Sequence, residues 1–448
     1  MTVLAEQIQT AQTAALLGVV GRVVSVTGMT VQAVGLPVPV GSVCEIGEAG
    51  RSVAAEVIGF RNDVTLLMPL ADSGGLSREQ PVRFMTDARK VAVGPGLLGR
   101  VVDGMGQACD AGPPIAADMN YPLDRTAPKA MDRTRIDTPL SVGIRSINAL
   151  LTAGSGGRLG FFAGTGVGKS VLMGMMTRFT SADVSVIALV GERGREVGDF
   201  LAKELGPDGL KRSVVISSTS DQSPLLRVRA GFVATAIAEY FRDRGNEVLL
   251  LMDSVTRLAM AARQIGLAAG EPPATKGYPP SVFALLPRLL ERSGRTARGS
   301  ITGLYTVLVE GDDLNDPIAD AVRGILDGHI WLSRRIAGRG QYPAVSVLDS
   351  VSRLMPDVTD AEHMAAARKI RRLLATWAEI EDLVNIGAYA AGSNAEFDLV
   401  IQMRPEIESF MQQGMHDGYD FDASRAALLV LSKRIDEASE KLEKGQSK

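Results

Sequence analysis

The residues with the clearest chemistry form a glycine-rich segment that ends in Gly-Lys-Ser. It follows an apolar run over 159–162 and precedes residues 171–176, which are compatible with a helix. This context is the one a P-loop requires, although the first position of the usual pattern is alanine. The backbone N–H groups of such a loop converge on phosphate oxygens. We therefore expect nucleotide phosphates to be bound by Ala163, Gly164, Thr165, Gly166, Val167, Gly168, Lys169, Ser170 and Val171.

Two residues of this segment have specific expected roles. Lys169 is expected to reach the β- and γ-phosphates, and the hydroxyl of Ser170 to ligate Mg²⁺. The alternative is a tight turn from strand to helix that ends in Gly-Lys-Ser by chance. The correct flanks on both sides disfavour it.

A second acidic position follows the apolar run 248–252. Asp253 stands directly after that run, about 85 residues beyond the glycine loop. It matches the carboxylate that holds Mg²⁺ through water in P-loop enzymes. An aspartate at a strand end is also ordinary turn chemistry, so the assignment depends on the P-loop.

Charged residues follow the apolar run 184–190. Glu192 and Arg193 come immediately after Gly191. Beside a phosphate loop, Glu192 could polarise the attacking water and Arg193 could neutralise charge on the transferring phosphoryl group. By itself such a run is most often a solvated loop.

The surrounding pattern predicts three structured parts. Short β-rich runs between residues 17 and 84, separated by glycine and proline turns, predict a small barrel. From about residue 144, alternating apolar runs and helix-length stretches predict a parallel α/β sheet with both faces covered. After about residue 357 the apolar spacing becomes three to four, which predicts helices. The domains are expected at 1–17, 18–90, 91–356 and 357–448, the third including a Gly/Pro-rich connector over 93–143.

Composition excludes several classes of function. The 448 residues carry 48 Lys+Arg against 51 Asp+Glu, a net charge of −3, which gives no excess charge for nonspecific binding to nucleic acid or anionic lipid. Two cysteines and three histidines lack metal-ligand spacing, so a disulfide scaffold is excluded and a structural zinc site is disfavoured. The apolar runs are too short to span a membrane and no signal peptide is recognised, so a cytoplasmic protein is expected.

Taken together, these motifs resemble those of a known superfamily. Segments 163–170, 191–196 and 250–257 are similar to the catalytic subunits of rotary ATP synthases, and the likeness covers nearly the whole chain. It implies a RecA-like P-loop NTPase core between an N-terminal small β-barrel and a C-terminal helical domain. Segments 133–140, 311–320 and 383–389 resemble the type III secretion ATPases in particular, with the flagellar export branch preferred over the injectisome branch.

The resemblance implies roles for individual residues. Lys169 and Ser170 correspond to the phosphate and Mg²⁺ contacts, and Asp253 to the second acidic position. Glu192 corresponds to the catalytic carboxylate and Arg193 to the arginine beside it. Two further residues are Tyr342, which corresponds to the ring stacked on adenine, and Arg353, which corresponds to an arginine finger for the neighbouring subunit. Arg257 aligns with a second family arginine whose role stays open.

The resemblance also implies partners and a location. It implies a homohexamer, a central stalk protein at the Asp312–Asp316 loop, and a negative regulator at the helix expected over residues 1–17. The further partners that it implies are export chaperone–substrate complexes and the membrane export gate. The implied location is cytoplasmic, peripheral at the inner-membrane base of the apparatus. For the acidic loop, Asn315 or Asp316 before Pro317 is also a good helix start.

Three alternatives remain beside Mg²⁺-dependent ATP hydrolysis for flagellar export. The injectisome alternative shares the chemistry and differs in partners. A noncatalytic ring subunit would lack the carboxylate that Glu192 supplies. An RNA helicase of this superfamily would need stacking aromatics and basic residues in the barrel, where only Phe60 and Phe84 are aromatic, so no nucleic-acid partner is expected.

Overall fold

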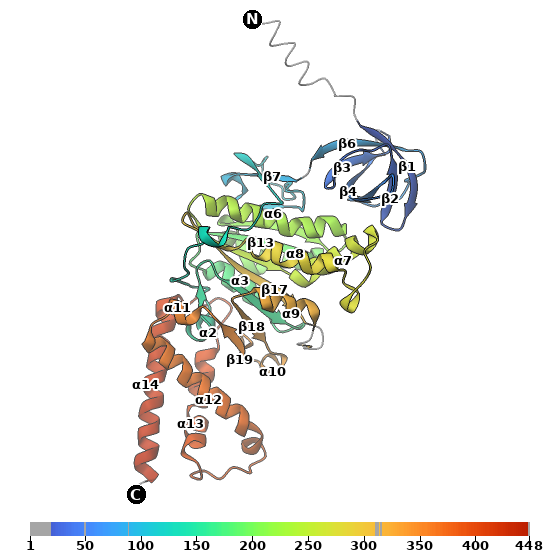
Figure 1. Cartoon of the computed structure of the whole chain (residues 1–448). Helices are drawn as coiled ribbons and strands as arrows, with labels where there is room; N and C mark the ends of the chain where they lie inside the picture. The colour runs from blue at the N-terminus through green and yellow to red at the C-terminus, as the bar shows by residue number, and fades with distance from the viewer. Residues whose placement is uncertain (1–18, 49–50, 88, 310–312, 314–315, 447–448) are drawn as a thin grey trace, which may run out of the picture.

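A computed structural model of the chain describes residues 19–446, apart from 49–50, 88, 310–312 and 314–315. The barrel, the α/β domain and the helical region follow one another in chain order, with the α/β domain in the middle (Figure 1). This arrangement confirms the predicted fold class. The helix expected over residues 1–17 lies outside the described residues.

The N-terminal part is a closed barrel in the strand order β1-β2-β5-β4-β3-β6. Closure removes the sheet edges, and small residues and valines such as Val23, Val31 and Ala33 fill the interior. Sequence pattern did not predict β3 and β6, whose apolar residues are interrupted by charged or polar ones. The strands are β1 (Val20–Thr27), β2 (Thr30–Val34), β3 (Ser42–Ile46), β4 (Val53–Arg61), β5 (Val64–Pro69) and β6 (Pro81–Asp87).

The expected Gly/Pro connector contains more regular structure than its composition indicates. Strands β7 (Lys90–Val93) and β9 (Met119–Pro122) pair antiparallel, and β8 (Arg100–Val102) joins the central sheet beside β14 (Ser213–Thr219). Short helical turns lie at η1 (Pro95–Leu97) and η2 (Ala130–Asp132). The connector is thus part of the α/β domain.

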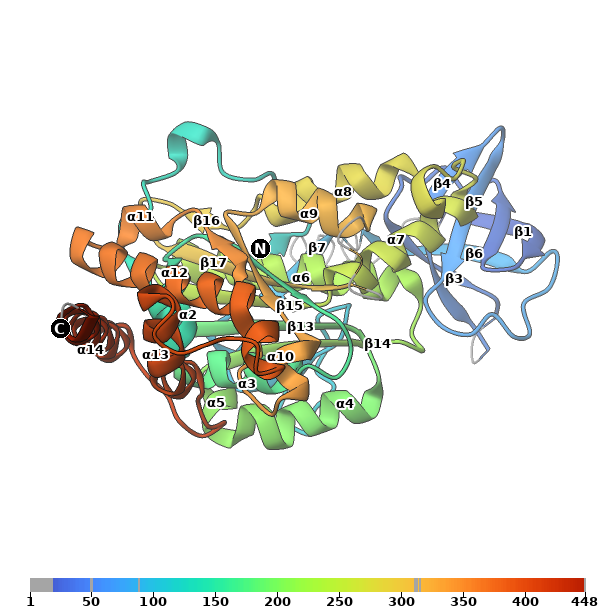
Figure 2. The ribbon, with the colours of Figure 1, turned by 90° about the horizontal axis from the view of Figure 1, so that it is seen from below.

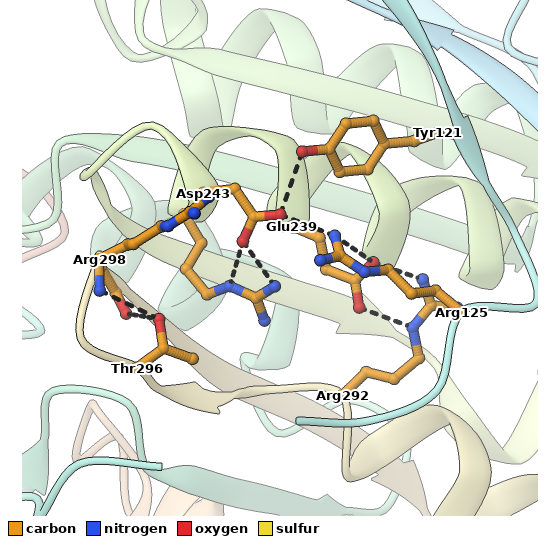
Figure 3. Close-up of polar contacts among 9 residues, drawn as sticks. Tyr121, Arg125, Glu239, Asp243, Arg292, Thr296 and Arg298 are labelled. Carbon is orange, nitrogen blue, oxygen red and sulfur yellow. Dashed lines mark hydrogen bonds and ion pairs between the residues drawn. The ribbon is translucent and has the colours of Figure 1, made fainter. Parts of the chain in front are cut away.

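A network of buried and partly exposed charges joins the connector to the end of helix α6 (Pro224–Asp243), as Figure 3 shows. Arg292 and Glu239 form an ion pair of 2.7 Å with exposed side-chain fractions of 0% and 1%. Arg292 also donates to the carbonyl of Leu123, and Tyr121 and Arg125 donate to the carboxylate of Asp243. The path of the connector therefore depends on ion pairs that form only when the connector packs against α6.

The central sheet has nine strands, of which eight follow the order β19-β18-β12-β17-β15-β13-β14-β8 and β16 pairs with β17. Its interior strands are parallel and buried on both faces, as β13 is along its whole length. The five predicted strands are present, whereas β18 and the antiparallel edge strand β19 were not predicted. The remaining strands are β12 (Arg158–Ala163), β13 (Val184–Glu192), β15 (Glu247–Asp253), β16 (Gly294–Arg295), β17 (Ser300–Leu308), β18 (Gly328–Leu332) and β19 (Val345–Ser352); β10 (Pro139–Leu140) and β11 (Ala153–Gly154) form a separate pair.

Helices cover both faces of this sheet and divide its core into two layers (Figure 2). Helices α6 to α9 pack on one face, and α2 to α5 lie on the other. The bounds are α2 (Arg145–Leu150), α3 (Lys169–Phe179), α4 (Gly194–Asp199), η3 (Phe200–Leu205), α5 (Gly206–Lys211), α7 (Val255–Ala269), η4 (Thr275–Gly277), α8 (Pro280–Leu290), α9 (Pro317–Ile325) and α10 (Arg334–Gly338).

The C-terminal region is helical, as predicted, and shares its core with the layer around α2 and α3. Its helices are α11 (Met355–Val358), α12 (Ala361–Asn385), α13 (Ala395–Met411) and α14 (Phe421–Gln446). The apolar spacing predicted α12 and α14 but not α13. Among the described residues, no helix combines the length and the apolar composition that a membrane span requires.

Candidate nucleotide-binding and catalytic site

The glycine loop lies between the end of β12 at Ala163 and the start of α3 at Lys169. Gly166 and Gly168 have φ values of 80° and 85°, which a side chain would strain. At Gly164, an added Cβ would lie 2.6 Å from the guanidinium of Arg334, so that side chain would have to shift to make room for one. The loop thus presents its backbone and the N-terminus of α3 to an anion.

The residues of the glycine loop differ in their exposure. Thr165, Gly166 and Ser170 are exposed at the mouth of the site. Ala163 is buried because it is the last residue of the strand, and Val167 is 2% exposed and packs in the core below α3.

Lys169 joins two acidic residues that stand at the ends of neighbouring strands. Its Nζ lies 2.6 Å from Oδ1 of Asp253, at the end of β15, and 3.7 Å from Oε1 of Glu192, at the end of β13. The two strands are adjacent and parallel, with Asp253 in register with Leu189. Thr306 on β17 donates a further hydrogen bond of 2.6 Å to Asp253. The sheet therefore brings three predicted residues together.

Glu192 is a buried carboxylate with an unusual environment. The residue is 7% exposed, and its Oε1 has no hydrogen-bond partner among the described residues. Burial, and secondarily the charge of Asp253, raise the pKa of Glu192 to about 7. Gly191, with φ of 72°, turns the chain just before it. A base of this pKa can accept a proton near neutral pH.

The arginine in contact with Glu192 is Arg257 rather than Arg193. Nη1 of Arg257 lies 2.6 Å from Oε2 of Glu192 and donates to the carbonyl of Gly191 at 2.7 Å. Arg193 is adjacent in sequence, but its side chain is 78% exposed and pairs with Glu196. The contact of Arg193 with a phosphoryl group stays a prediction.

Tyr342 lines a pocket of about 540 Å³ beside the glycine loop. Its ring would lie 3.3 Å from a Cβ added at Gly168, and the residue is 45% exposed. Val171 also lines this pocket. The opposite wall comes from the helical region, at Gln413, Gly414 and Met415, which sequence reasoning missed. The backbone N–H of Gln413 donates to the carbonyl of Tyr342 at 2.9 Å, a contact for which the sequence holds no local signal.

Arg353 lies at the opposite end of the sheet from the site of its own chain. It is exposed, and its N–H donates to the carbonyl of Asp327, whose side chain binds the N–H of Arg158 at the start of β12. The glycine loop follows the other end of β12, and five steps of about 3.3 Å put roughly 17 Å between the two ends. Arg353 does not join the cluster around Lys169.

The acidic loop before α9 is described only in part. Asp312 lies outside the described residues, and Asp313 pairs with Lys276 at 3.2 Å. Asp316 caps α9 by accepting hydrogen bonds from Ile318 and Ala319, with Pro317 at the first helical position. The predicted helix start is confirmed.

The fold and the site define a class of protein. A strand, glycine loop and helix, with acidic residues ending adjacent parallel strands, are the parts of a RecA-like P-loop nucleotide-binding domain. Residues 143–352 match the nucleotide-binding domain of the ATP synthase alpha/beta family. Residues 16–86 match the beta-barrel domain of that family, and residues 359–429 match the T3SS EscN ATPase C-terminal domain.

Individual relatives narrow the class. The chain is 50% identical to the flagellum-specific ATP synthase of Bacillus subtilis, over 92% of this chain and 95% of the relative. It is 52% identical to the type 3 secretion system ATPase of Xanthomonas euvesicatoria, over 88% and 89%. The chain therefore belongs to the family of flagellum-specific ATP synthases and type 3 secretion ATPases.

Solved structures agree with this assignment. The assembled ATPase EscN from the enteropathogenic E. coli type III secretion system superimposes with a TM-score of 0.87 at 43% identity, over 92% of this chain and all of EscN. EscN in complex with its central stalk EscO gives a TM-score of 0.85 at 42% identity with the same coverage.

Proposed function

We propose that this chain is a Mg²⁺-dependent ATPase that acts in a homohexameric ring and powers protein export by the flagellar type III secretion apparatus. The observation that carries the enzymatic part is Glu192, a buried carboxylate 3.7 Å from the P-loop lysine, whose Oε1 has no hydrogen-bond partner among the described residues. A noncatalytic nucleotide-binding subunit has no need of such a group.

The chain's own groups account for the chemistry. The backbone of the glycine loop and the N-terminus of α3 bind the phosphates of ATP, and Lys169 exchanges Asp253 for the β- and γ-phosphates. Oε1 of Glu192 accepts a hydrogen bond from the attacking water and polarises it. Arg257 holds the other oxygen, so the carboxylate keeps one orientation. Arg193 turns from Glu196 towards the transferring phosphoryl group.

The residues present fit a magnesium ion that arrives with the nucleotide. Ser170 is exposed in the first turn of α3. The carboxylate of Asp253, which is 3% exposed, forms polar contacts with Lys169 and Thr306. No group of three or more His, Cys, Asp or Glu in the described part could bind a metal alone. We expect Ser170 to bind Mg²⁺ directly and Asp253 through water, where the ion neutralises charge on phosphate oxygens.

The proposed site also includes a pocket for adenine and an arginine finger. Adenine fits the pocket of about 540 Å³ and stacks on the half-exposed ring of Tyr342. Arg353 is exposed and lies near the start of β12, whose other end, roughly 17 Å away, leads into the glycine loop, so we infer that it enters the site of a neighbouring subunit. There its guanidinium stabilises charge in the transition state.

The proposed cellular role is inferred from the similar proteins and from the resemblance of particular segments of this chain. The stalk complex of EscN supports a central stalk partner, and the flagellum-specific relatives support flagellar export. We propose that the stalk protein binds at the loop Asp312–Asp316. Within this proposal, residues 1–17 bind a negative regulator, and hydrolysis releases chaperone–substrate complexes at the membrane export gate. The protein then works in the cytoplasm, peripheral at the inner-membrane base of the apparatus.

An injectisome ATPase is the second candidate, because a type 3 secretion ATPase is also 52% identical. The test is to express the chain in a non-motile bacterium that lacks its flagellar ATPase and in a strain that lacks its injectisome ATPase. Restored motility with no restored effector secretion supports flagellar export. Restored effector secretion alone overturns it. The Glu192→Gln variant at equal expression is the control, and should restore neither.

A further inference from the structure

The edge strand that precedes Arg353 is interrupted by a large bulge. His329 of β18 pairs with Val351 of β19, whereas Trp331 pairs with Ser346. One residue of β18 therefore stands opposite four residues of β19, positions 347–350. Bulges of this kind change the direction of the strand and re-aim the side chains that follow them. Arg353 comes two residues after the pairing resumes.

Hydrogen bonds hold the bulge in one conformation. Ser350 is fully buried, and its Oγ accepts from the N–H of Trp331 at 2.9 Å and donates to the carbonyl of Ser346 at 2.5 Å. Ser346 in turn donates to the carboxylate of Asp349 at 2.6 Å, and a ring nitrogen of His329 contacts the carbonyl of Asp349 at 3.0 Å. Several hydrogen bonds thus hold residues 346–350, the segment before Arg353.

A further hydrogen bond to this segment comes from the helical region. Arg371, on α12, donates from Nη2 to the carbonyl of Ser350 at 3.2 Å. This carbonyl lies three residues before Arg353. The side chain of Arg371 is half-buried, and burial lowers the pKa of its guanidinium. The contact joins the C-terminal region to the strand end that carries the expected finger.

We propose that Arg371 and Ser350 are positioning residues, which fix the backbone from which Arg353 enters the neighbouring subunit. This inference rests on the proposed role of Arg353. It adds that the orientation of α12 sets the position of the finger. A movement of the helical region in one subunit then changes the rate of hydrolysis in the adjacent site.

The first test is steady-state ATPase kinetics of the full chain at concentrations where it forms rings. Arg371→Met and Ser350→Ala should each lower kcat by about tenfold at unchanged KM, because the finger acts on the transition state and not on bound ATP. Arg371→Lys, which keeps a donor, should recover part of this loss. Arg368→Met is the matched control, since Arg368 lies on the same helix, is exposed and contacts only its own helix at Met364 among the described residues. It should leave kcat unchanged.

The second test is a double-mutant cycle with Arg353→Ala, which distinguishes positioning from general damage. Positioning predicts that Arg371→Met has no further effect once Arg353 is gone. If Arg353→Ala alone leaves kcat unchanged, the proposed finger is wrong. If Arg353→Ala lowers kcat but Arg371→Met either has no effect or keeps its full effect in the double variant, the finger stands and positioning is wrong. Should Arg371→Met unfold below the assay temperature, the same cycle with Ser350→Ala, which leaves α12 unchanged, decides between positioning and general damage.

Discussion

The ammonium group of Lys169 lies 2.6 Å from the carboxylate of Asp253. The P-loop lysine therefore neutralises the carboxylate that we expect to hold Mg²⁺ through water. Both residues are nearly buried, with side-chain exposures of 13% and 4%, so neither charge is left without a partner. Under the proposed function, Lys169 would leave this pair to bind the phosphates of ATP, and Asp253 would act through the Mg²⁺ that accompanies them.

Replacement of Lys169 should strongly reduce turnover. In Lys169→Ala the phosphates lose their cation, and Asp253 and Glu192 are left as buried carboxylates without it. We expect kcat to fall by at least about 100-fold, the size typical for loss of a preorganised charge. The measurement is phosphate release at saturating ATP. Lys211→Ala, a change of an exposed lysine on α5, is the control and should keep wild-type turnover. Wild-type activity in Lys169→Ala would contradict the assignment of the glycine loop as the phosphate-binding site.

The pH dependence of kcat/KM should report Glu192. Its pKa is raised to about 7, so below that pH the carboxylate is increasingly protonated and can no longer accept a proton from the attacking water. We expect kcat/KM to fall by about tenfold for each pH unit below 7 and to level off above it. Glu192→Gln should be slow at every pH without this transition. A wild-type profile that is flat between pH 5.5 and 8 contradicts the role of Glu192.

Tyr342 should affect ATP binding more than chemistry. Tyr342→Ala removes the ring beside Gly168 and should raise KM by about tenfold, because stacking on a base contributes about 1–3 kcal/mol. Tyr342→Phe keeps the ring and should resemble the wild type. Titration with a fluorescent ATP analogue provides the independent affinity. Equal affinities for the alanine and phenylalanine variants would place adenine elsewhere.

How far the sequence anticipates this site depends on whether a signal is local. The glycine loop, Asp253 and Glu192 each follow an apolar run, and carboxyl ends of parallel strands meet at one edge, so their proximity could be predicted. The direction of a side chain is not local. The sequence marks both Arg193 and Arg257 as arginines near the site, but only the packing of the folded chain determines that Arg257 contacts Glu192.

The elements that were missed share a physical reason. Strand β19 is an edge strand with a four-residue bulge, so its burial does not alternate, and α13 carries an internal Pro405 and mixed apolar spacing. The wall of the base pocket at Gln413 lies more than 200 residues from the glycine loop. Such long-range contacts have no signature in a single segment.

The buried ion pair between Arg292 and Glu239 should determine whether the connector stays docked. Glu239→Gln leaves a guanidinium with no exposed surface without its counterion, which should cost about 3–5 kcal/mol of unfolding free energy. Chemical denaturation measures this cost. Glu379→Gln, a change of an exposed glutamate on α12, should stay within about 0.5 kcal/mol of the wild type. An equally small effect for Glu239→Gln would show that water or a neighbour replaces the pair.

The most direct test of the proposed enzyme is whether one active site needs two chains. Arg353→Ala and Lys169→Ala proteins, each inactive alone and each with its own affinity tag, are mixed, and rings that carry both tags are purified in sequence. In an equal mixture, about a quarter of the interfaces join an intact P-loop to an intact finger. A shared site therefore predicts that these rings recover ATPase activity to about a quarter of the wild-type level. Doubly tagged rings with no more activity than the separate variants would show that the site is not shared.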